Sequence, residues 1–232
     1  MYVRKASLGE CEDWEIQDMK VTLDAFWDRY GHEEYEGTEF AKALIRLPNV
    51  SETGPWIAGG SVRRLVTSKL QDSDFDFFFK DQAQFDAFCS DMEASGAKLL
   101  NENDFNVTFR LPASDPKPVD LDTFEGGGPE LKVQAIKIRF YDSLEAVLES
   151  FDFSLTQFGF DGETLVFGKW SLFDTASKRL VPEKITYGTS TLRRIIKYTK
   201  QGFTICGGGL ANILEQVVAN PSIIQSKVEY ID

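Results

Sequence analysis

The 232-residue sequence contains very little histidine and cysteine. His32 is its single histidine, and its three cysteines, Cys11, Cys89 and Cys206, lie far apart with no C-x-x-C pair. The spacing of the cysteines argues against a zinc site and against a disulfide framework. The lone histidine removes most chemistry that depends on a histidine base or on histidine-rich metal ligation.

Long apolar runs are also absent. The longest are far below the ~18–20 residues that a membrane-spanning helix needs, and the opening MYVRKASLGECEDWEIQ lacks the apolar core of a secretory signal. We therefore expect a cytoplasmic protein with no membrane partner. Hydrophobic residues make up 42% of the chain, which is enough to bury a core and excludes global disorder. The length favours one domain, or one domain plus a helical extension.

The net charge of −12 is distributed unevenly along the chain. Residues 1–40 hold eleven acids and four bases, a net charge of −7, whereas residues 178–200 hold seven bases and one acid, a net charge of +6. The total argues against a protein that is coated in nucleic acid. The basic stripe can be an anion site, or it can be the solvated face of a helix.

Apolar spacing and turn residues predict both helices and strands. The expected helices cover residues 12–30, 38–47, 62–70 with Ser61 as N-cap, 82–95, 143–150 with a capping box of Asp142 and Glu145, 191–201 with Ser190 as N-cap, and 210–219 after a glycine loop at 206–209. The expected strands cover residues 56–58, 74–79, 105–111 and 132–140, with a hairpin-type turn at Asp161-Gly162.

The most informative stretch is WIAGGSVRRLVTSKLQDSDFDFFF, residues 56–79, which indicates a strand, a Gly-Gly-Ser turn, a helix and a second strand. Gly59 and Gly60 allow the backbone to approach a phosphate closely, because no Cβ stands in the way. Ser61 opens a helix whose free N–H groups and dipole favour an anion. The stretch is not a P-loop, because no Gly-Lys-Ser/Thr follows the glycines.

The second strand of this stretch carries an Asp-x-Asp pair. Asp74 and Asp76 lie two residues apart on one strand face, roughly 7 Å along the strand at ~3.3 Å per residue. An isolated pair of this kind is usually an exposed strand face, but the preceding Gly-Gly-Ser-helix unit favours metal ligation. Two such carboxylates can converge on two Mg²⁺ ions about 3.5–4 Å apart, which can activate a hydroxyl and hold a triphosphate leaving group.

These motifs resemble the signature of the DNA-polymerase-beta-like nucleotidyltransferases, closest to the head of class II CCA-adding enzymes and bacterial poly(A) polymerases. GGSVRR at 59–64 resembles the family's G-G-x-V-R-D, and DFD at 74–76 resembles its D-x-D. FDFSLTQF at 151–158 resembles R-R-D-F-T-[IV]-N-A-L, a segment tied to ribose recognition. LRRIIKY at 192–198, followed by Gly202-Phe203, resembles the R-x-x-R-F…G-F helix of the family's neck.

The chain also departs from the family pattern. Arg64 stands where the family usually has Asp, and Leu155-Thr156-Gln157 replaces I-N-A. Thr189–Arg193 lacks the acidic pair of E-D-x-x-R, whose side chains select C and A in the family. The sequence is also too short for the body and tail that hold tRNA. The resemblance therefore implies a compact member, of a kind that phages also encode, with an acceptor that the motifs do not specify.

The resemblance implies a set of site residues. Asp74 and Asp76 would be the catalytic carboxylates and the ligands of Mg²⁺ or Mn²⁺. The residues expected to bind the nucleotide are Gly59, Gly60, Ser61, Arg63, Asp152, Arg193, Arg194 and Lys197. Two roles stay open from the residues themselves: Arg63 reaches the triphosphate or pairs with an acid, and Asp152 contacts the ribose or pairs with an arginine.

A third carboxylate is the remaining open point of the expected site. Asp120 and Asp122 are candidates for it, and a turn-associated acidic pair is the alternative interpretation of both. Gln134, on the next strand, is not a carboxylate, so a site with two carboxylates is also open.

The resemblance implies an α+β fold with a small mixed sheet, flanking helices and a helical C-terminal neck. We expect an acidic N-terminal helical segment over residues 1–48, a catalytic head over 49–142 and a neck-like helical and hairpin region over 143–232. The implied activity is metal-dependent transfer of a nucleoside monophosphate from an NTP to an acceptor hydroxyl, with release of pyrophosphate. An RNA or tRNA 3′ end is the favoured acceptor. The alternatives are a protein or small-molecule acceptor, or a catalytically inactive nucleotide- or RNA-binding module.

Overall fold

The computed structural model describes residues 21–22, 38–67, 72–114 and 128–225. These residues form two compact units. The first contains those within Lys20–Val147 and Phe158–Val166, and the second contains those within Leu148–Gln157 and Phe167–Asp232. The hairpin at Asp161-Gly162 thus belongs to the first unit, whereas we expected it to belong to the neck-like region over residues 143–232.

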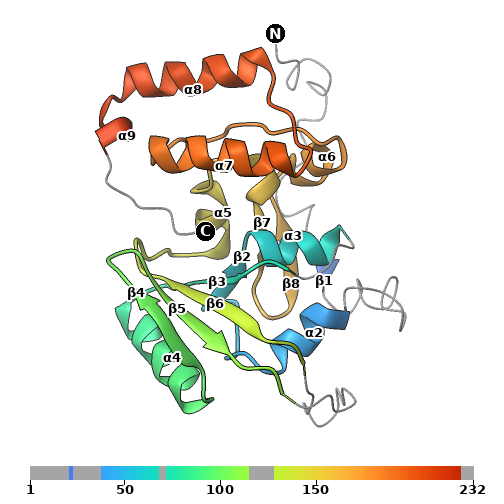
Figure 1. Ribbon diagram of the computed structural model, residues 1–232, viewed down its shortest axis with the longest axis vertical. Helices are drawn as coiled ribbons and strands as arrows, with labels where there is room; N and C mark the ends of the chain where they lie inside the picture. The colour runs from blue at the N-terminus through green and yellow to red at the C-terminus, as the bar shows by residue number, and fades with distance from the viewer. Residues whose placement is uncertain (1–20, 23–37, 68–71, 115–127, 226–232) are drawn as a thin grey trace. The chain divides into compact units, whose positions relative to one another are not determined.

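A mixed sheet forms the centre of the first unit (Figure 1). Among the described residues it has eight strands, in the order β1-β8-β7-β2-β3-β6-β5-β4. Strands β3 and β6 pair in parallel, whereas the pairs β1–β8, β2–β3, β2–β7, β4–β5 and β5–β6 are antiparallel, so the expected mixed sheet is confirmed. The strands are β1 (Val21–Thr22), β2 (Trp56–Ala58), β3 (Phe75–Phe78), β4 (Lys98–Glu102), β5 (Asn106–Leu111), β6 (Leu131–Ile136), β7 (Phe158–Phe160) and β8 (Thr164–Phe167).

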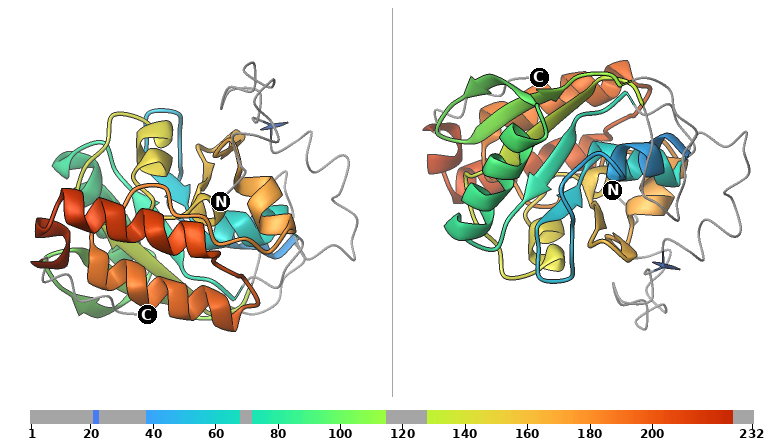
Figure 2. Two further views of the ribbon diagram at one scale, coloured as in Figure 1. Left: turned by 90° about the horizontal axis from the view of Figure 1, so that it is seen from above. Right: turned by 90° about the horizontal axis from the view of Figure 1, so that it is seen from below.

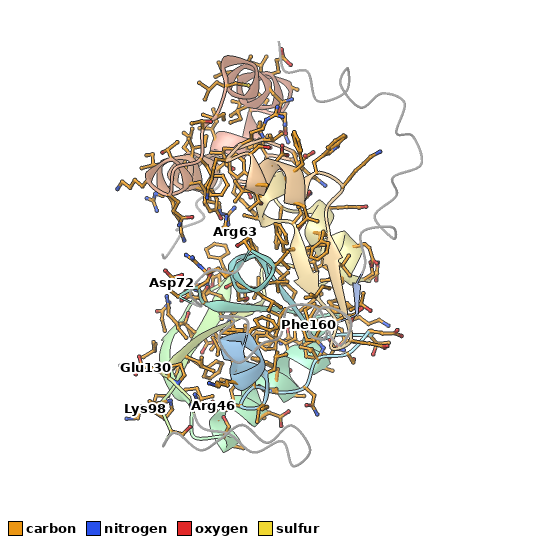
Figure 3. The ribbon with its side chains drawn as sticks, turned by 90° about the vertical axis from the view of Figure 1, so that its right-hand side faces the viewer. Arg46, Arg63, Asp72, Lys98, Glu130 and Phe160 are labelled. Atoms are coloured by element: carbon orange, nitrogen blue, oxygen red, sulfur yellow. The ribbon has the colours of Figure 1, made fainter. Side chains whose placement is uncertain are left out.

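Helices cover both faces of this sheet. Helices α2 (Thr38–Leu44) and α4 (Gln82–Ala94) lie on one face and α3 (Gly60–Val66) on the other (Figures 2 and 3). The rings of Phe75 and Phe77 in β3 contact the α2–α4 side, with centroids 5.7 Å from Phe40 and 4.5 Å from Phe88. Because side chains alternate along a strand, Asp76 lies on the face that α3 covers.

The second unit is mainly helical. It contains η2 (Ser154–Thr156), α6 (Ser171–Ala176), α7 (Gly188–Lys200), α8 (Gly207–Ala219) and α9 (Ser222–Gln225), while α5 (Leu144–Glu149) spans the point where the chain enters it. Helices α7 and α8 lie side by side (Figures 1 and 2). Ile195 of α7 and Ile205 pack against two apolar clusters, one around Phe153 and Tyr198 and the other around Ile213. In the described part of the chain, no helix combines the length and the apolar character that crossing a bilayer requires.

Several helices begin earlier than the sequence predicted. Helix α3 begins at Gly60, because the positive φ of Gly59 turns the chain directly after β2, so Ser61 is not its N-cap. Helix α7 begins at Gly188, so Ser190 lies inside the helix, where it is buried. A serine caps a helix from the position before its first turn. Ser61 and Ser190 instead lie within the first turns of their helices, where both are buried.

Two other helix starts also differ from the prediction. In α5 the N–H of Ala146 donates to Ser143 Oγ at 3.2 Å, so Ser143 provides the side-chain cap that was expected from Asp142. The glycines at 207–209 form the first turn of α8 rather than a loop, and the Gly209 N–H donates to Cys206 Sγ at 3.4 Å. Packing of α8 through Ile213 outweighs the weak helix propensity of glycine.

The expected helix over residues 12–30 is wrong at the two positions that the structure describes. Val21 and Thr22 form β1 and pair with Leu165 and Thr164 of β8. Both side chains are β-branched and suit a sheet edge. The rest of that helix, most of the acidic segment over 1–48 and the candidates Asp120 and Asp122 lie outside the described residues.

Cys89 of α4 is expected to react slowly with alkylating reagents. Burial, together with the nearby carboxylates of Asp86, Glu102 and Glu93, raises the pKa of its thiol to about 11. At pH 8 such a thiol is about 0.1% thiolate, against roughly a quarter for an ordinary thiol. We expect iodoacetamide to label Cys89 on the order of 100-fold more slowly in the folded protein than in urea, as measured by peptide mass spectrometry. Equal rates in both states would contradict this expectation.

Candidate active site

A glycine turn joins β2 to α3 and forms one side of the candidate site. Gly59 has φ +94° and ψ −131°, a conformation that side chains rarely allow, and its N–H donates to the Phe158 carbonyl of β7 at 2.7 Å. A Cβ on Gly60 would overlap the hydroxyl of Ser73, which precedes β3. The positive φ therefore requires glycine at Gly59, and the close approach of Ser73 requires it at Gly60.

Replacing Gly60 with alanine is expected to lower the free energy of unfolding by about 1–3 kcal/mol, because the new methyl group overpacks against Ser73. Adding Ser73→Ala should restore much of this loss, since it removes the overlapping oxygen and leaves a Cβ at 3.3 Å. Gly207→Ala is the control, because nothing lies within 4 Å of the added atom. Urea denaturation measures all four proteins, and a double variant no more stable than Gly60→Ala would overturn the steric argument.

Asp76 lies beside this turn. It pairs with Ala58 of β2 and, on its other side, with Gln134 of β6, which places it in the middle of the sheet. Its Oδ2 is 3.6 Å from the position that a Cβ on Gly59 would occupy. The Gly-Gly motif and the Asp-x-Asp motif therefore meet in space, and the half-buried carboxylate faces a turn that has no side chain at its closest point.

Asp74 has two partners on β6. Its Oδ2 accepts hydrogen bonds from Lys132 Nζ and Gln134 Nε2, both at 2.7 Å. Asn106 Nδ2 donates to Gln134 Oε1 at 3.4 Å. The sequence did not predict Lys132 as a site residue, although a signal was present. The apolar residues Leu131, Val133 and Ala135 alternate with Lys132 and Gln134, which places these two on one face of the strand.

The donor set of Asp74 and Asp76 fits a divalent cation. Carboxylate oxygens suit Mg²⁺ and Mn²⁺, and Mg²⁺ is commonly bound by one or two carboxylates together with water and substrate phosphates. Gly59 leaves room beside Asp76 that a larger residue would fill. Within the described residues, no group of three or more His, Cys, Asp or Glu side chains gathers as a ligand cluster. Among the described residues the site thus offers the two carboxylates of Asp74 and Asp76, and a third carboxylate stays a prediction.

The other residues expected near the triphosphate lie on α3. Ser61 is fully buried, and Arg63, labelled at α3 in Figure 3, is also buried. Arg64, which replaces the Asp of the family motif, forms an ion pair with Asp72, with Nε and Oδ1 2.5 Å apart. This ion pair ties α3 to the segment that leads into β3.

Asp152 and Arg194 lie in the second unit and bind each other. Arg194 Nη1 donates to both carboxylate oxygens of Asp152, at 2.5 and 2.7 Å, and Thr191 Oγ1 donates to Oδ2 at 2.8 Å. Of the two roles left open for Asp152, the structure shows the arginine pair, and a ribose contact stays a prediction. Arg193, exposed, and Lys197, half-buried, lie one turn apart on α7.

A protein-family model described as "Gad2: Gabija anti-defense 2 family protein" matches residues 17–178, which is more than half of the chain. The chain belongs to the Gad2 family. No curated protein matches its sequence. The family description refers to action against the Gabija defence and does not state a chemical reaction.

Solved structures of CCA-adding enzymes are similar to this Gad2-family chain. An apo form matches 89% of the chain and 48% of its own length, at 13% identity and a TM-score of 0.50. A complex with ATP matches 86% of the chain and 45% of its own length, at 15% identity and a TM-score of 0.50. The Thermotoga maritima enzyme bound to tRNA matches 71% of the chain and 37% of its own length, at 16% identity and a TM-score of 0.47. The chain thus spans less than half the length of each, and the first two show its nucleotidyltransferase fold.

Proposed function

We propose that the chain transfers a nucleoside monophosphate from an NTP to an acceptor hydroxyl, with release of pyrophosphate, in a reaction that depends on Mg²⁺ or Mn²⁺. The observation that carries this proposal is the placement of Asp76 against the Gly59-Gly60 turn, with Asp74 directly before β3 and hydrogen-bonded to Lys132 and Gln134. The nucleotidyltransferase fold supports it.

The transfer is an in-line substitution at the α-phosphorus. The acceptor oxygen forms a bond to this phosphorus while the bond to the bridging oxygen of the β-phosphate breaks, and the electron pair of that bond leaves with pyrophosphate. The hydroxyl proton passes to solvent. A bound divalent ion supplies neutralisation of the phosphate charge and a lower pKa of the hydroxyl. Asp74 and Asp76 hold that ion, and the Gly59-Gly60 turn admits the triphosphate because it carries no side chain.

An RNA 3′ end is the acceptor that we propose first. The stretch over residues 178–200 has a net charge of +6 in a protein of net charge −12. Within it, Arg193 and Lys197 lie four residues apart on α7 and so share a helix face. A short basic face of this kind suits the phosphates of a single strand end better than it suits a long duplex.

A hydroxyl on a protein of the Gabija defence is the second candidate acceptor. The family description favours it, because covalent modification of a defence protein is a direct route to counteracting that defence. The same two carboxylates and the same NTP would serve this reaction, so the two candidates differ only in the acceptor.

Labelling separates these candidates. The protein is incubated with Mg²⁺ and each α-³²P-labelled NTP in turn, together with lysate of a strain that carries the Gabija system. Label that ribonuclease removes supports the RNA acceptor, and label that protease removes supports the protein acceptor. Label in a small, nuclease- and protease-resistant product points to a small-molecule acceptor. Binding of NTP without any labelled product, for all four NTPs, contradicts the proposal and favours an inactive binding module.

A further inference from the structure

Strand β6 brings positive charge and hydrogen-bond donors to the carboxylate pair. Lys132 Nζ and Gln134 Nε2 both contact the same oxygen, Asp74 Oδ2, at 2.7 Å. The Lys132 side chain is 39% exposed and that of Asp74 is 30% exposed, so bulk water screens this ion pair only in part. The contact is therefore partly shielded from solvent, and Gln134 holds the same carboxylate oxygen in place.

The orientation of these donors is set by the sheet. Strands β3 and β6 run parallel, with Phe75 opposite Val133 and Asp76 opposite Gln134. Lys132 and Gln134 flank Val133 and lie on the other face of β6, on the same side as the two aspartates. The Gln134 amide oxygen already accepts from Asn106, which turns its nitrogen toward Asp74. Strand β6 thus offers an ammonium and an amide N–H to the site, and neither can coordinate a metal ion.

We propose that Lys132 is a built-in counter-ion of Asp74 and that the site consequently holds a single divalent ion instead of two. The ammonium places one positive charge beside Asp74, where a second divalent ion would bring two, and the bound ion is held by Asp76 together with Asp74. Lys132 is in this sense a positioning residue, since it acts through Asp74. This inference rests on the metal site of the proposed function and adds the number of divalent ions that the site binds.

Removal of the ammonium should strengthen divalent binding, because a like charge within a few ångströms of the ion is lost. Free Mn²⁺ is measured by electron paramagnetic resonance during titration of the full-length protein without NTP. The Asp74→Asn/Asp76→Asn double variant is titrated in the same way, and the ions that it no longer binds are assigned to the site. This subtraction excludes ions bound by other acidic surface residues. We expect one such ion in the wild type, and Lys132→Gln should bind at the site at least tenfold more tightly, or bind a second ion.

Lys137→Gln is the matched control. Lys137 follows the same strand and forms an ion pair of similar length, with its Nζ 2.8 Å from Glu102 Oε1, but it does not touch Asp74 in the structure. It should bind Mn²⁺ as the wild type does. Lys132→Arg retains the charge and should stay within about threefold of the wild type, while thermal melting verifies the fold of each variant.

Two results would overturn the inference. One is a wild-type protein that binds two ions at the site, and the other is a Lys132→Gln variant that matches Lys137→Gln in affinity and stoichiometry. The Mn²⁺ titration does not involve turnover, so it separates this inference from the proposed function. If Lys132→Gln changes Mn²⁺ binding but no labelled product forms, the counter-ion role of Lys132 is supported and the transferase activity is rejected. If labelled product forms but Lys132→Gln does not change Mn²⁺ binding, the transferase activity is supported and the counter-ion role is rejected.

Discussion

Replacing Asp76 with asparagine is expected to reduce nucleotidyl transfer at least about 1,000-fold, which corresponds to about 4 kcal/mol of lost transition-state stabilisation. Asparagine keeps the shape of the side chain between Ala58 and Gln134 in the sheet but removes its negative charge. Divalent binding and alignment of the triphosphate beside Gly59 should both fail. The initial rate of transfer from α-³²P-labelled NTP measures the loss.

Asp72→Asn is the control for this experiment. Asp72 stands four residues before Asp76, is exposed and forms its ion pair with Arg64 instead of facing the glycine turn. The Asp72→Asn substitution removes the same negative charge as Asp76→Asn, but at an exposed residue outside the site. It should therefore change the transfer rate by less than about threefold, in line with the small effects of surface substitutions. Equal losses in the two variants would show that general electrostatics, rather than metal ligation by Asp76, explains the effect. Full activity of Asp76→Asn would remove the basis of the proposed mechanism.

Replacing Asp152 with asparagine is expected to lower the free energy of unfolding by about 3 kcal/mol. The Asp152 side chain is 11% exposed and that of Arg194 is 28% exposed, so the substitution leaves a largely buried guanidinium without its carboxylate. The value lies at the lower end of the range for buried pairs, because part of Arg194 reaches water. Urea denaturation measures the change, and hydrogen exchange of the α7 amides locates it in the second unit.

Glu130→Gln provides the matched control for this loss. Glu130 and Arg110 form a surface pair whose charged atoms are 3.9 Å apart and whose side chains are 58% and 45% exposed. Breaking a pair of this kind should cost less than about 0.5 kcal/mol. In the Asp152→Asn/Arg194→Met double variant, part of the stability should return because no unpaired buried charge remains. An Asp152→Asn protein as stable as Glu130→Gln would show that the ion pair does not stabilise the unit.

The core of the candidate site could be predicted from sequence because its determinants are local. Glycine is needed where Gly59 adopts a positive φ. Residue alternation through β3 and the residue before it places Asp74 and Asp76 on the face opposite the buried Phe75 and Phe77. The hairpin at Asp161-Gly162 was predictable for the same reason, since the Asp161 side chain accepts hydrogen bonds from the N–H groups of the turn.

Helix starts and the strand β1 could not be predicted in the same way. Ser61 and Ser190 have good capping side chains, but tertiary packing buries both of them inside helices. Val21 and Thr22 fit an apolar helical spacing, yet they pair with β8, which lies more than 140 residues away in the chain. In each case a contact with a distant segment outweighed a local preference of at most about 1 kcal/mol.

The sequence by itself determined the glycine turn and the strand with its two aspartates, because glycine conformation and strand alternation act over a few residues. Its resemblance to the nucleotidyltransferases implied the fold and the mixed sheet. Only the tertiary structure decided the partners of the charged groups. Lys132 is 58 residues from Asp74, and Arg194 is 42 residues from Asp152, so these pairs exist only after the strands and helices have packed. Charges attract regardless of sequence order and each acid could have paired with several bases, which is why the fold selects the partner.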